Sequence, residues 1–305
     1  MAAGRSTWST AWWLIVAVAS TGAQPTADAS PTGGEPVFPA GGVPGEHAGA
    51  VGDEVWSGSF GGSFFNVTAP ALYPRLVPNA TTAVIVSPGG SYKWLSWELE
   101  GESAARWLNG LGVSAFILKY RVPARPWLPF GGAPLMDIQR AMGLVRSHLP
   151  NASKVGVLGF SAGSHLSTHL SNDFSKRSYP RIDAADDLDA RPDFAMLLYP
   201  WCVVGDTSKH DTSCNADTNR TLTMQLTSAT PTTFVVQAED DPVHVENSLF
   251  YFLGLKAARA PASELHVYPA GGHGFGLCTR DLEVCSWPQR AADFMRARGF
   301  VRSGG

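Results

Sequence analysis

The sequence is poor in cysteine and in charge and has no long apolar run, and each shortage narrows the functions open to it. Charged residues make up 16% of the 305 residues and the formal net charge is −3, which argues against nucleic acid or an anionic membrane as the main partner. No stretch beyond the N-terminus is apolar and long enough to span a bilayer. The four cysteines form no C-x-x-C pair, which argues against a zinc site, and we expect neither a metal nor a cofactor.

The first 50 residues differ in composition from the rest. Residues 11–19 (AWWLIVAVA) are apolar, follow a lone charge at Arg5 and precede small residues, so we predict a secretory signal peptide over 1–23. Such a short apolar run cannot cross a hydrocarbon core of ~30 Å. Residues 24–50 hold five prolines and six glycines, which predicts a disordered spacer. One folded domain, 51–305, should follow.

Two further patterns fit export from the cell. The sequence has four N-x-[ST] sequons, where roughly one is expected by chance, and they predict a glycoprotein. They begin at Asn66, Asn79, Asn151 and Asn219. The local disulfides Cys202–Cys214 and Cys278–Cys285 are the simplest of the three connectivities that four cysteines allow. We therefore expect a secreted, extracellular protein. No pattern in the sequence indicates an oligomeric state.

From about residue 51 onward, short β-branched runs alternate with amphipathic helical stretches. The expected strands are 83–87, 114–120, 155–160, 194–199, 233–237 and 265–268. The expected helices are 97–111, 135–149, 162–170, 245–259 and 288–298. Several of the strands are continuous apolar runs, which is typical of strands buried on both faces. The alternation predicts an α/β fold, with a mostly parallel central sheet covered on both faces by helices through right-handed crossovers.

Ser161 lies in the pentapeptide G-F-S-A-G, between a predicted buried strand and a predicted helix. That context is typical of a nucleophile elbow, a sharp turn that presents the serine hydroxyl at the carboxyl edge of a sheet. A serine hydroxyl is a poor nucleophile at neutral pH and needs a base, which an acid must orient. Ser161 is therefore the candidate nucleophile of a Ser–His–Asp triad.

The candidate base and acid follow other predicted strands, and the carboxyl ends of parallel strands share one edge of a sheet. His273 lies between glycines after the last predicted strand and is the candidate base. Asp240, in the segment Ala-Glu-Asp-Asp after the strand before it, is the favoured acid. Glu239 and Asp241 compete with it in the same segment, and Asp206 would serve if the acid followed the preceding strand.

The negative oxygen of a tetrahedral intermediate needs N–H donors that are already in place. The amide of Ala162, at the start of the helix after Ser161, is one candidate donor. The amides of Gly90 and Ser91, in Pro-Gly-Gly-Ser after the first predicted strand, are the other source.

Two other histidines could suggest a metal. His165 and His169 are one helical turn apart, as in H-x-x-x-H zinc helices. Leu166 stands where the glutamate base of such a helix would be, so we interpret both as ordinary helix histidines.

Longer segments resemble one known superfamily. They are SPGGSYKWLSWELEGE, LKYRVP, PLMDIQRAMGLVRS, GFSAGSHL, ARPDFAMLLYP, AEDDPVHVENSLFYF and ELHVYPAGGHGFGL. Together they are similar to α/β-hydrolases, and within that superfamily to esterases often called acetylxylan esterases, near the hormone-sensitive-lipase-like and prolyl-oligopeptidase-like branches. The resemblance covers roughly residues 54–300. It implies an α/β-hydrolase fold and a serine esterase with Ser161, Asp240 (before Val243 in D-x-x-V) and His273 as nucleophile, acid and base.

The resemblance and the expected secretion favour acetylated polysaccharide, such as acetylated xylan, as the substrate and acetyl as the group released. Trp94 and Trp97 directly follow the glycine-rich loop, where aromatic faces can stack on sugar rings; packing in the core is the alternative explanation. Other functions stay open. They are a broad short-chain carboxylesterase, a lipase or polyester hydrolase that prefers long acyl chains, and a non-catalytic hydrolase scaffold used for binding.

Overall fold

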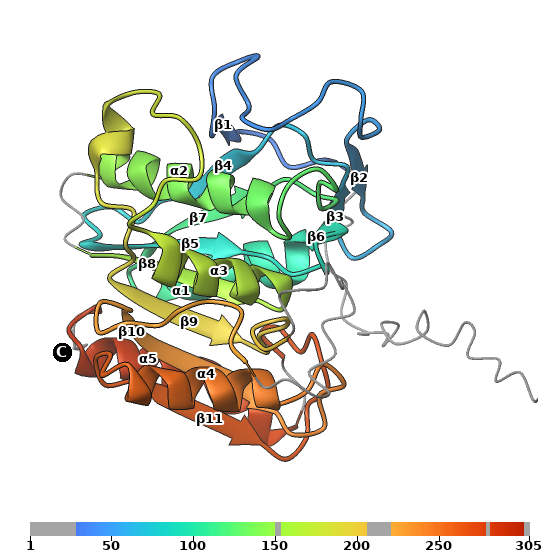
Figure 1. Ribbon diagram of the computed structural model, residues 1–305. Helices are drawn as coiled ribbons and strands as arrows, with labels where there is room; N and C mark the ends of the chain where they lie inside the picture. The colour runs from blue at the N-terminus through green and yellow to red at the C-terminus, as the bar shows by residue number, and fades with distance from the viewer. Residues whose placement is uncertain (1–28, 150–153, 206–220, 279–280, 302–305) are drawn as a thin grey trace, which may run out of the picture.

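A central eight-stranded sheet organises the chain in the computed structural model, which describes residues 29–149, 154–205, 221–278 and 281–301 (Figure 1). In spatial order the strands are β1 (Glu35–Pro36), β4 (Ala71–Arg75), β7 (Ser114–Lys119), β5 (Thr82–Ser87), β8 (Lys154–Phe160), β9 (Phe194–Leu198), β10 (Thr232–Ala238) and β11 (Glu264–Tyr268). From β7 to β11 all neighbours pair in parallel, whereas β4 is antiparallel to β7 and β1 to β4. The predicted mostly parallel sheet is confirmed.

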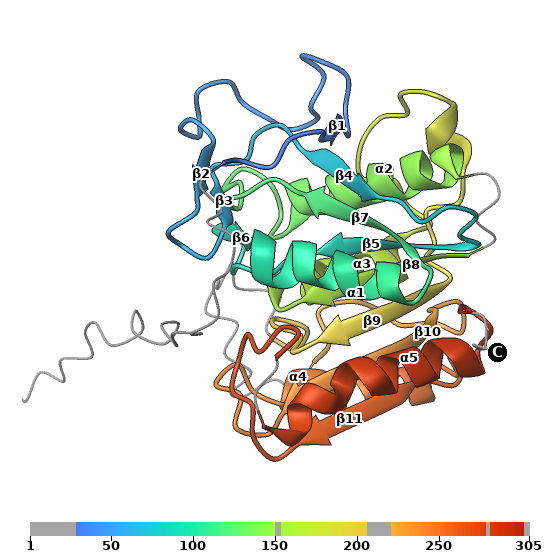
Figure 2. The same ribbon diagram turned by 180° about the vertical axis from the view of Figure 1, so that it is seen from behind.

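Helices cover both faces of this sheet, as predicted. They are α1 (Ser103–Gly110), α2 (Gly132–His148), α3 (Ala162–Asp173), α4 (Glu246–Ala257) and α5 (Trp287–Ala297). Figure 1 shows α2, α3 and α4 on one face, and Figure 2 shows α1 and α5 on the other. The rings of Trp107 on α1 and Trp287 on α5 lie 5.2 Å apart and join the helices of the second face. The described residues also contain three short helical turns: η1 (a π-helix, Trp97–Glu102), η2 (Ala184–Asp187) and η3 (Glu283–Ser286).

The central strands form the core. Every residue of β5, β7, β9 and β10 is buried, and these strands are rich in valine, isoleucine, leucine and phenylalanine. A strand covered by helices on both faces has no solvent side, which explains why the sequence shows continuous apolar runs there rather than alternation. This rigid core fixes the positions of the loops at the carboxyl ends of the strands.

A small antiparallel sheet lies beside the carboxyl end of β5. It consists of β2 (Val55–Ser57), β3 (Ser63–Phe65) and β6 (Trp94–Ser96), with β3 in the middle. β6 follows the glycine-rich loop directly, so the backbone leaves the main sheet at β5 and joins the small sheet within a few residues. The small sheet therefore forms a wall next to the loops that could carry chemistry.

The segment 29–50 packs against the domain, so the prediction of a disordered spacer is wrong for these residues. β1 pairs with β4, and the side chains of Val37 and Phe38 are buried in the core. Glu46 forms an ion pair at 2.9 Å with Arg125, whose side chain is fully buried. Low average hydrophobicity predicted disorder, but two buried apolar side chains and the ion pairs of Glu46 with the buried Arg125 and Arg121 hold this stretch against the domain.

Several sequence predictions fall outside the described residues. These are the signal peptide (1–23), the first part of the proposed spacer, Asp206, Cys214 and the sequons at Asn151 and Asn219. Of the other two sequons, Asn79 is exposed in a turn and Asn66 is half-buried. Among the helices that are described, none is both long and apolar enough to cross a membrane.

Candidate active site

Ser161 lies on a sharp turn between β8 and α3. Its φ of 52° and ψ of −116° lie outside the regions that residues with side chains favour. The turn depends on two glycines: a Cβ on Gly163 would lie 1.9 Å from the carbonyl oxygen of Ser87, and one on Gly159 would lie 2.3 Å from that of Gly163. The structure therefore contains the strand–turn–helix elbow that the sequence predicted.

The hydroxyl of Ser161 meets the imidazole of His273 at the carboxyl edge of the sheet. The Ser161 Oγ lies 2.8 Å from Nε2 of His273. On the other side of the ring, Nδ1 lies 3.1 and 3.0 Å from the two carboxylate oxygens of Asp241. The Asp241 side chain is fully buried, whereas that of His273 is 27% exposed. A buried carboxylate at Nδ1 favours the tautomer that leaves Nε2 free to accept the serine proton.

The structure puts Asp241, and not Asp240, against the imidazole, so the prediction of Asp240 as the acid is wrong. Oδ1 of Asp240 instead accepts hydrogen bonds from the amides of Gly271, at 2.9 Å, and Gly272, at 2.8 Å. Asp241 turns inward, and its Oδ1 also accepts the amide two residues further on. Neighbouring side chains in a turn point in different directions, and spacing along the chain does not tell which one faces the histidine.

The predicted oxyanion donors lie on the two segments next to Ser161. A Cβ on Gly89 would lie only 2.9 Å from that of Ser161, so the glycine-rich loop passes directly beside the serine. Gly90 has a φ of 129° and Ser91 a φ of 54°, which turns the loop sharply. The amide of Ala162 is the first of α3 and has no acceptor within the helix. The predicted donors Gly90, Ser91 and Ala162 are therefore in suitable segments.

Comparisons with known proteins add independent information. No protein-family model matches the chain. The chain is 31% identical over 222 residues to an acetylxylan esterase of Xylanibacter ruminicola, and 32% identical over 213 residues to endo-1,4-beta-xylanase B of Butyrivibrio fibrisolvens. Each match covers 65% of this chain but only 42% and 33% of the respective relatives. The chain thus spans less than half the length of the curated relatives it matches.

One solved structure matches nearly end to end. An acetyl ester-xyloside bifunctional hydrolase from Caldicellulosiruptor lactoaceticus is 29% identical, with a TM-score of 0.65, and the match covers 88% of this chain and 97% of that one. The strand order and the elbow at Ser161 agree with this similarity. The chain has the α/β-hydrolase fold. It is similar to acetylxylan esterase-like enzymes, which confirms the resemblance seen in the sequence.

The two tryptophans predicted to bind substrate have different environments in this α/β-hydrolase. Trp97 is fully buried, with its ring 5.0 Å from that of Phe64 and 4.8 Å from that of Tyr73, so its prediction as a sugar-stacking residue is wrong. Trp94 is half-buried on β6, and its ring lies 5.8 Å from that of Phe60, which is 49% exposed. Trp94 therefore stays a candidate for substrate contact.

The two helix histidines of the α/β-hydrolase have partners of their own. His165 is buried, and its Nδ1 lies 2.8 Å from the hydroxyl of Tyr92. Burial lowers the pKa of His165 well below its ordinary value, so the ring is neutral at neutral pH. Nδ1 of His169 pairs with Asp173 at 2.9 Å. The part of the chain that the structure describes contains no cluster of three or more His, Cys, Asp or Glu side chains suited to a metal ion.

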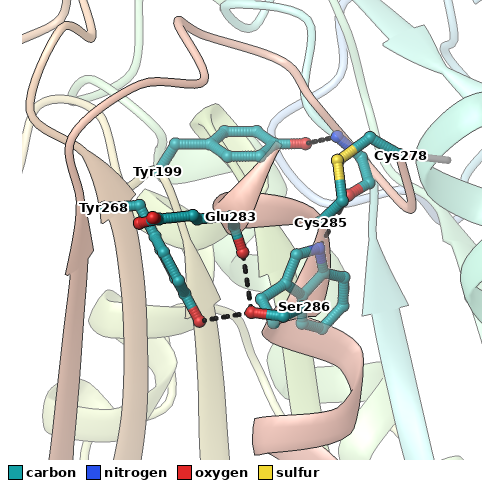
Figure 3. The surroundings of a disulfide bond; sticks show 8 residues. Tyr199, Tyr268, Cys278, Glu283, Cys285 and Ser286 are labelled. Carbon is teal, nitrogen blue, oxygen red and sulfur yellow. Dashed lines mark hydrogen bonds between the residues drawn. A yellow bond between two sulfur atoms is a disulfide. The ribbon is translucent and has the colours of Figure 1, made fainter. Parts of the chain in front are cut away.

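A disulfide closes the loop that follows His273. Cys278 and Cys285 are bonded, with Cα atoms 5.2 Å apart, as predicted (Figure 3). Cys202 is also in a disulfide, and Cys214, its predicted partner, lies outside the described residues. Figure 3 shows the hydroxyl of Tyr199 pointing at the backbone just before Cys278, where it accepts a hydrogen bond from the amide of Gly276 at 3.1 Å.

The sequence analysis did not identify two polar residues of the site, Glu100 and Tyr199. Glu100 is 4% exposed and Tyr199 fully buried, and their side chains are hydrogen-bonded to each other at 2.8 Å. Tyr199 directly follows β9, but the sequence analysis placed it inside the expected strand 194–199, so the position after a strand did not single it out. Glu100 lies in the π-helix η1 and carries no such signal, because helical glutamates are usually solvated.

Proposed function

We propose that this α/β-hydrolase is a serine esterase that removes acetyl groups from acetylated xylan or a related polysaccharide. The observation that carries the proposal is the 2.8 Å contact between Oγ of Ser161 and Nε2 of His273, with Asp241 at the other ring nitrogen. A serine hydroxyl in this environment has a base to take its proton and a carboxylate to stabilise the imidazolium that forms. The arrangement is suited to acyl transfer.

In the first half of the reaction, Oγ of Ser161 attacks the carbonyl carbon of the ester while its proton moves to Nε2 of His273. The buried charge of Asp241 stabilises the protonated ring. The amides of Ala162, Gly90 and Ser91 are the candidate donors to the negative oxygen of the tetrahedral intermediate. His273 then protonates the leaving alcohol oxygen, the carbon–oxygen bond of the ester breaks, and the acetyl group stays on Ser161.

In the second half, water attacks the acetyl-serine carbonyl while His273 accepts a proton from the water. The second tetrahedral intermediate collapses, the bond to Ser161 breaks, and the proton returns from His273 to Oγ. Acetate and the free enzyme result. Both halves use the same base and the same N–H donors, so a single site suffices for acylation and deacylation.

The choice of an acetylated sugar polymer as substrate is supported by the names of the relatives. One is an acetylxylan esterase, one an endo-1,4-beta-xylanase, and one an acetyl ester-xyloside bifunctional hydrolase. The half-buried Trp94, together with the exposed Phe60, supplies aromatic surface next to the glycine-rich loop. Aromatic faces of this kind suit the apolar faces of sugar rings.

The proposal includes export from the cell. The Cys278–Cys285 disulfide and the absence of free cysteines among the described residues fit an oxidising compartment. The exposed sequon at Asn79 would be accessible to glycosylation. Both features agree with the predicted signal peptide, and mass spectrometry of protein collected from the medium would test all three.

The decisive experiment compares the wild type with Ser161→Ala. We expect the substitution to lower turnover of p-nitrophenyl acetate by on the order of 10^6, and to abolish labelling by a fluorophosphonate. A variant within tenfold of the parent would overturn the serine mechanism. The substrate is tested by comparing acetate release from acetylated xylan with hydrolysis of p-nitrophenyl esters of increasing acyl chain length. Preference for long acyl chains would indicate a lipase. Absence of acetate release from the polymer would indicate a general short-chain esterase.

A further inference from the structure

A buried chain of hydrogen bonds joins the two loops that flank Ser161. The loop of residues 88–92 is called the oxyanion loop here, and the loop of residues 269–278 the histidine loop. Oε2 of Glu100 accepts a hydrogen bond from the amide of Gly89, in the oxyanion loop, at 2.7 Å. Oε1 of Glu100 accepts one from the hydroxyl of Tyr199 at 2.8 Å, and that hydroxyl accepts one from the amide of Gly276, in the histidine loop, at 3.1 Å.

Each end of this series of hydrogen bonds lies close to a group that the proposed reaction needs. Gly89 immediately precedes the candidate donor Gly90 and approaches Ser161 so closely that no side chain would fit between them. The ring of Tyr199 packs edge-on against that of His273, with 5.0 Å between the ring centres. A single carboxylate thus fixes the direction of one loop directly and of the other through a tyrosine.

A buried carboxylate is a costly way to hold two loops if only stability is needed. Burial raises the pKa of Glu100 above its ordinary value, which means that its charged form is penalised in the fold. Well-packed apolar residues often stabilise as much as a buried charged group or more. Tyr199 also has a φ of 38°, a left-handed backbone that residues with side chains rarely adopt, and such strain tends to gather at functional sites. Both features fit a role of Glu100 and Tyr199 in holding the two loops in position.

We propose that Glu100 is a positioning residue for the esterase reaction, holding the oxyanion loop through Gly89 and the histidine loop through Tyr199. The inference rests on the proposed function, because it assigns Glu100 a part in that reaction. Donors to a developing oxyanion act only when they are already in place, so loosening the two loops should affect the transition state more than the bound substrate.

The test uses Glu100→Gln, which keeps the shape of the side chain. A glutamine has one carbonyl oxygen, so it accepts from Gly89 or from Tyr199 but not from both. Its NH2 group then faces either the amide of Gly89, which cannot accept, or the hydroxyl of Tyr199, which would have to accept and leave its own proton without a partner. We expect kcat on p-nitrophenyl acetate to fall by about 10- to 100-fold, while KM changes by less than about threefold. A kcat within about twofold of the wild type would overturn the proposal.

Glu102→Gln is the matched control. Glu102 lies on the same π-helix, and its carboxylate binds Arg75 and the indole of Trp97 rather than either loop. We expect this variant to lose some stability and to keep the kcat of the wild type. If Glu102→Gln lowered kcat as much as Glu100→Gln does, the effect would belong to the helix as a whole and the proposal would be wrong.

A second pair of variants tests the route through the tyrosine. Tyr199→Phe removes the hydroxyl that links Glu100 to Gly276 and leaves the ring against His273. If Glu100 and Tyr199 act through the same series of hydrogen bonds, kcat of the double variant Glu100→Gln, Tyr199→Phe should be about as low as that of the more impaired single variant. Losses that multiply would mean that Glu100 and Tyr199 act independently, which contradicts the proposed route.

Hydrogen exchange separates failure of this inference from failure of the proposed function. Amide exchange in peptides covering the oxyanion loop and the histidine loop needs no substrate and no activity. Glu100→Gln should speed exchange in both loops, and Glu102→Gln in neither. Unchanged exchange in Glu100→Gln would overturn the inference even in an active esterase. Wild-type turnover in Ser161→Ala would overturn the proposed function even if exchange in both loops speeds up in Glu100→Gln.

Discussion

The Asp241 carboxylate lies within hydrogen-bonding distance of Nδ1 of His273 through both of its oxygens, although the two residues are 32 positions apart in the chain. If the carboxylate holds the ring tautomer, Asp241→Asn should lower kcat by about 10^4, because an amide at that position can donate to Nδ1 and leave the proton on Nε2. Steady-state kinetics with p-nitrophenyl acetate measures this loss.

The adjacent aspartate supplies the control. Asp240 accepts two amides of the histidine loop and has no place at the imidazole, so Asp240→Asn should cost about tenfold or less in kcat and should mainly lower the melting temperature. A larger loss in Asp240→Asn than in Asp241→Asn would return the acid to the position that the D-x-x-V spacing suggested.

Variants of the two tryptophans near the glycine-rich loop should distinguish a role in substrate binding from a role in core packing. Trp94→Ala is expected to lower activity on acetylated xylan more than activity on p-nitrophenyl acetate, because a small ester does not reach the aromatic surface that Trp94 shares with Phe60. Trp97→Ala is expected to destabilise the fold by about 3–5 kcal/mol, because its ring is fully buried. Equal losses of Trp94→Ala on both substrates would contradict a role for Trp94 in polymer binding.

The buried Glu100 should make stability depend on pH in a defined direction. Burial raises its pKa above the ordinary value of 4.5, so between 4.5 and the raised value the folded protein holds a proton that the unfolded chain has lost. The associated stability is complete below the unfolded pKa and is lost as the pH rises through the folded pKa. Glu100→Gln does not titrate at this position. The difference between its free energy of unfolding and that of the wild type should therefore shift in favour of the variant as the pH rises from 4.5 through the raised pKa of Glu100. Urea unfolding across that range would show it, and a difference that shrinks with pH would contradict it.

The disulfide after His273 should matter for both stability and turnover. The bond closes a short loop, and removing it in the double variant Cys278→Ser, Cys285→Ser should cost about 2–3 kcal/mol in the chain-entropy model. Because Cys278 also ends the histidine loop, two residues after Gly276, whose amide binds Tyr199, kcat should fall as well. The double variant is preferable to a reductant, which would also reach the disulfide of Cys202. Unchanged melting and kinetics would reject this role.

The sheet and its helices could be predicted from the sequence because continuous apolar strands and amphipathic helices each leave their own period in the chain. The contact between Ser161 and His273 could also be predicted from the sequence, because the carboxyl ends of parallel strands lie at one edge of a sheet. The choice between Asp240 and Asp241 did not follow, because it depends on how one turn rotates. The burial of Trp97 did not follow either, because an aromatic residue after a loop can face the core or the solvent.

Glu100 shows a different limit of sequence reasoning. Its partners come from three separate segments: Gly89 after β5, Tyr199 after β9 and, through Tyr199, Gly276 after β11. No local pattern marks a glutamate whose partners are supplied entirely by tertiary structure. Such a residue becomes visible only when burial and hydrogen bonds are examined together.

The ordered segment 29–50 has a practical consequence for anyone who shortens this chain. A version starting at residue 51 would strip Val37 and Phe38 from the core, and would deprive the buried guanidinium of Arg125 of its counter-ion Glu46. An uncompensated interior cation typically costs about 3–5 kcal/mol, a large part of the margin that keeps most domains folded. The safe place to cut lies upstream of β1.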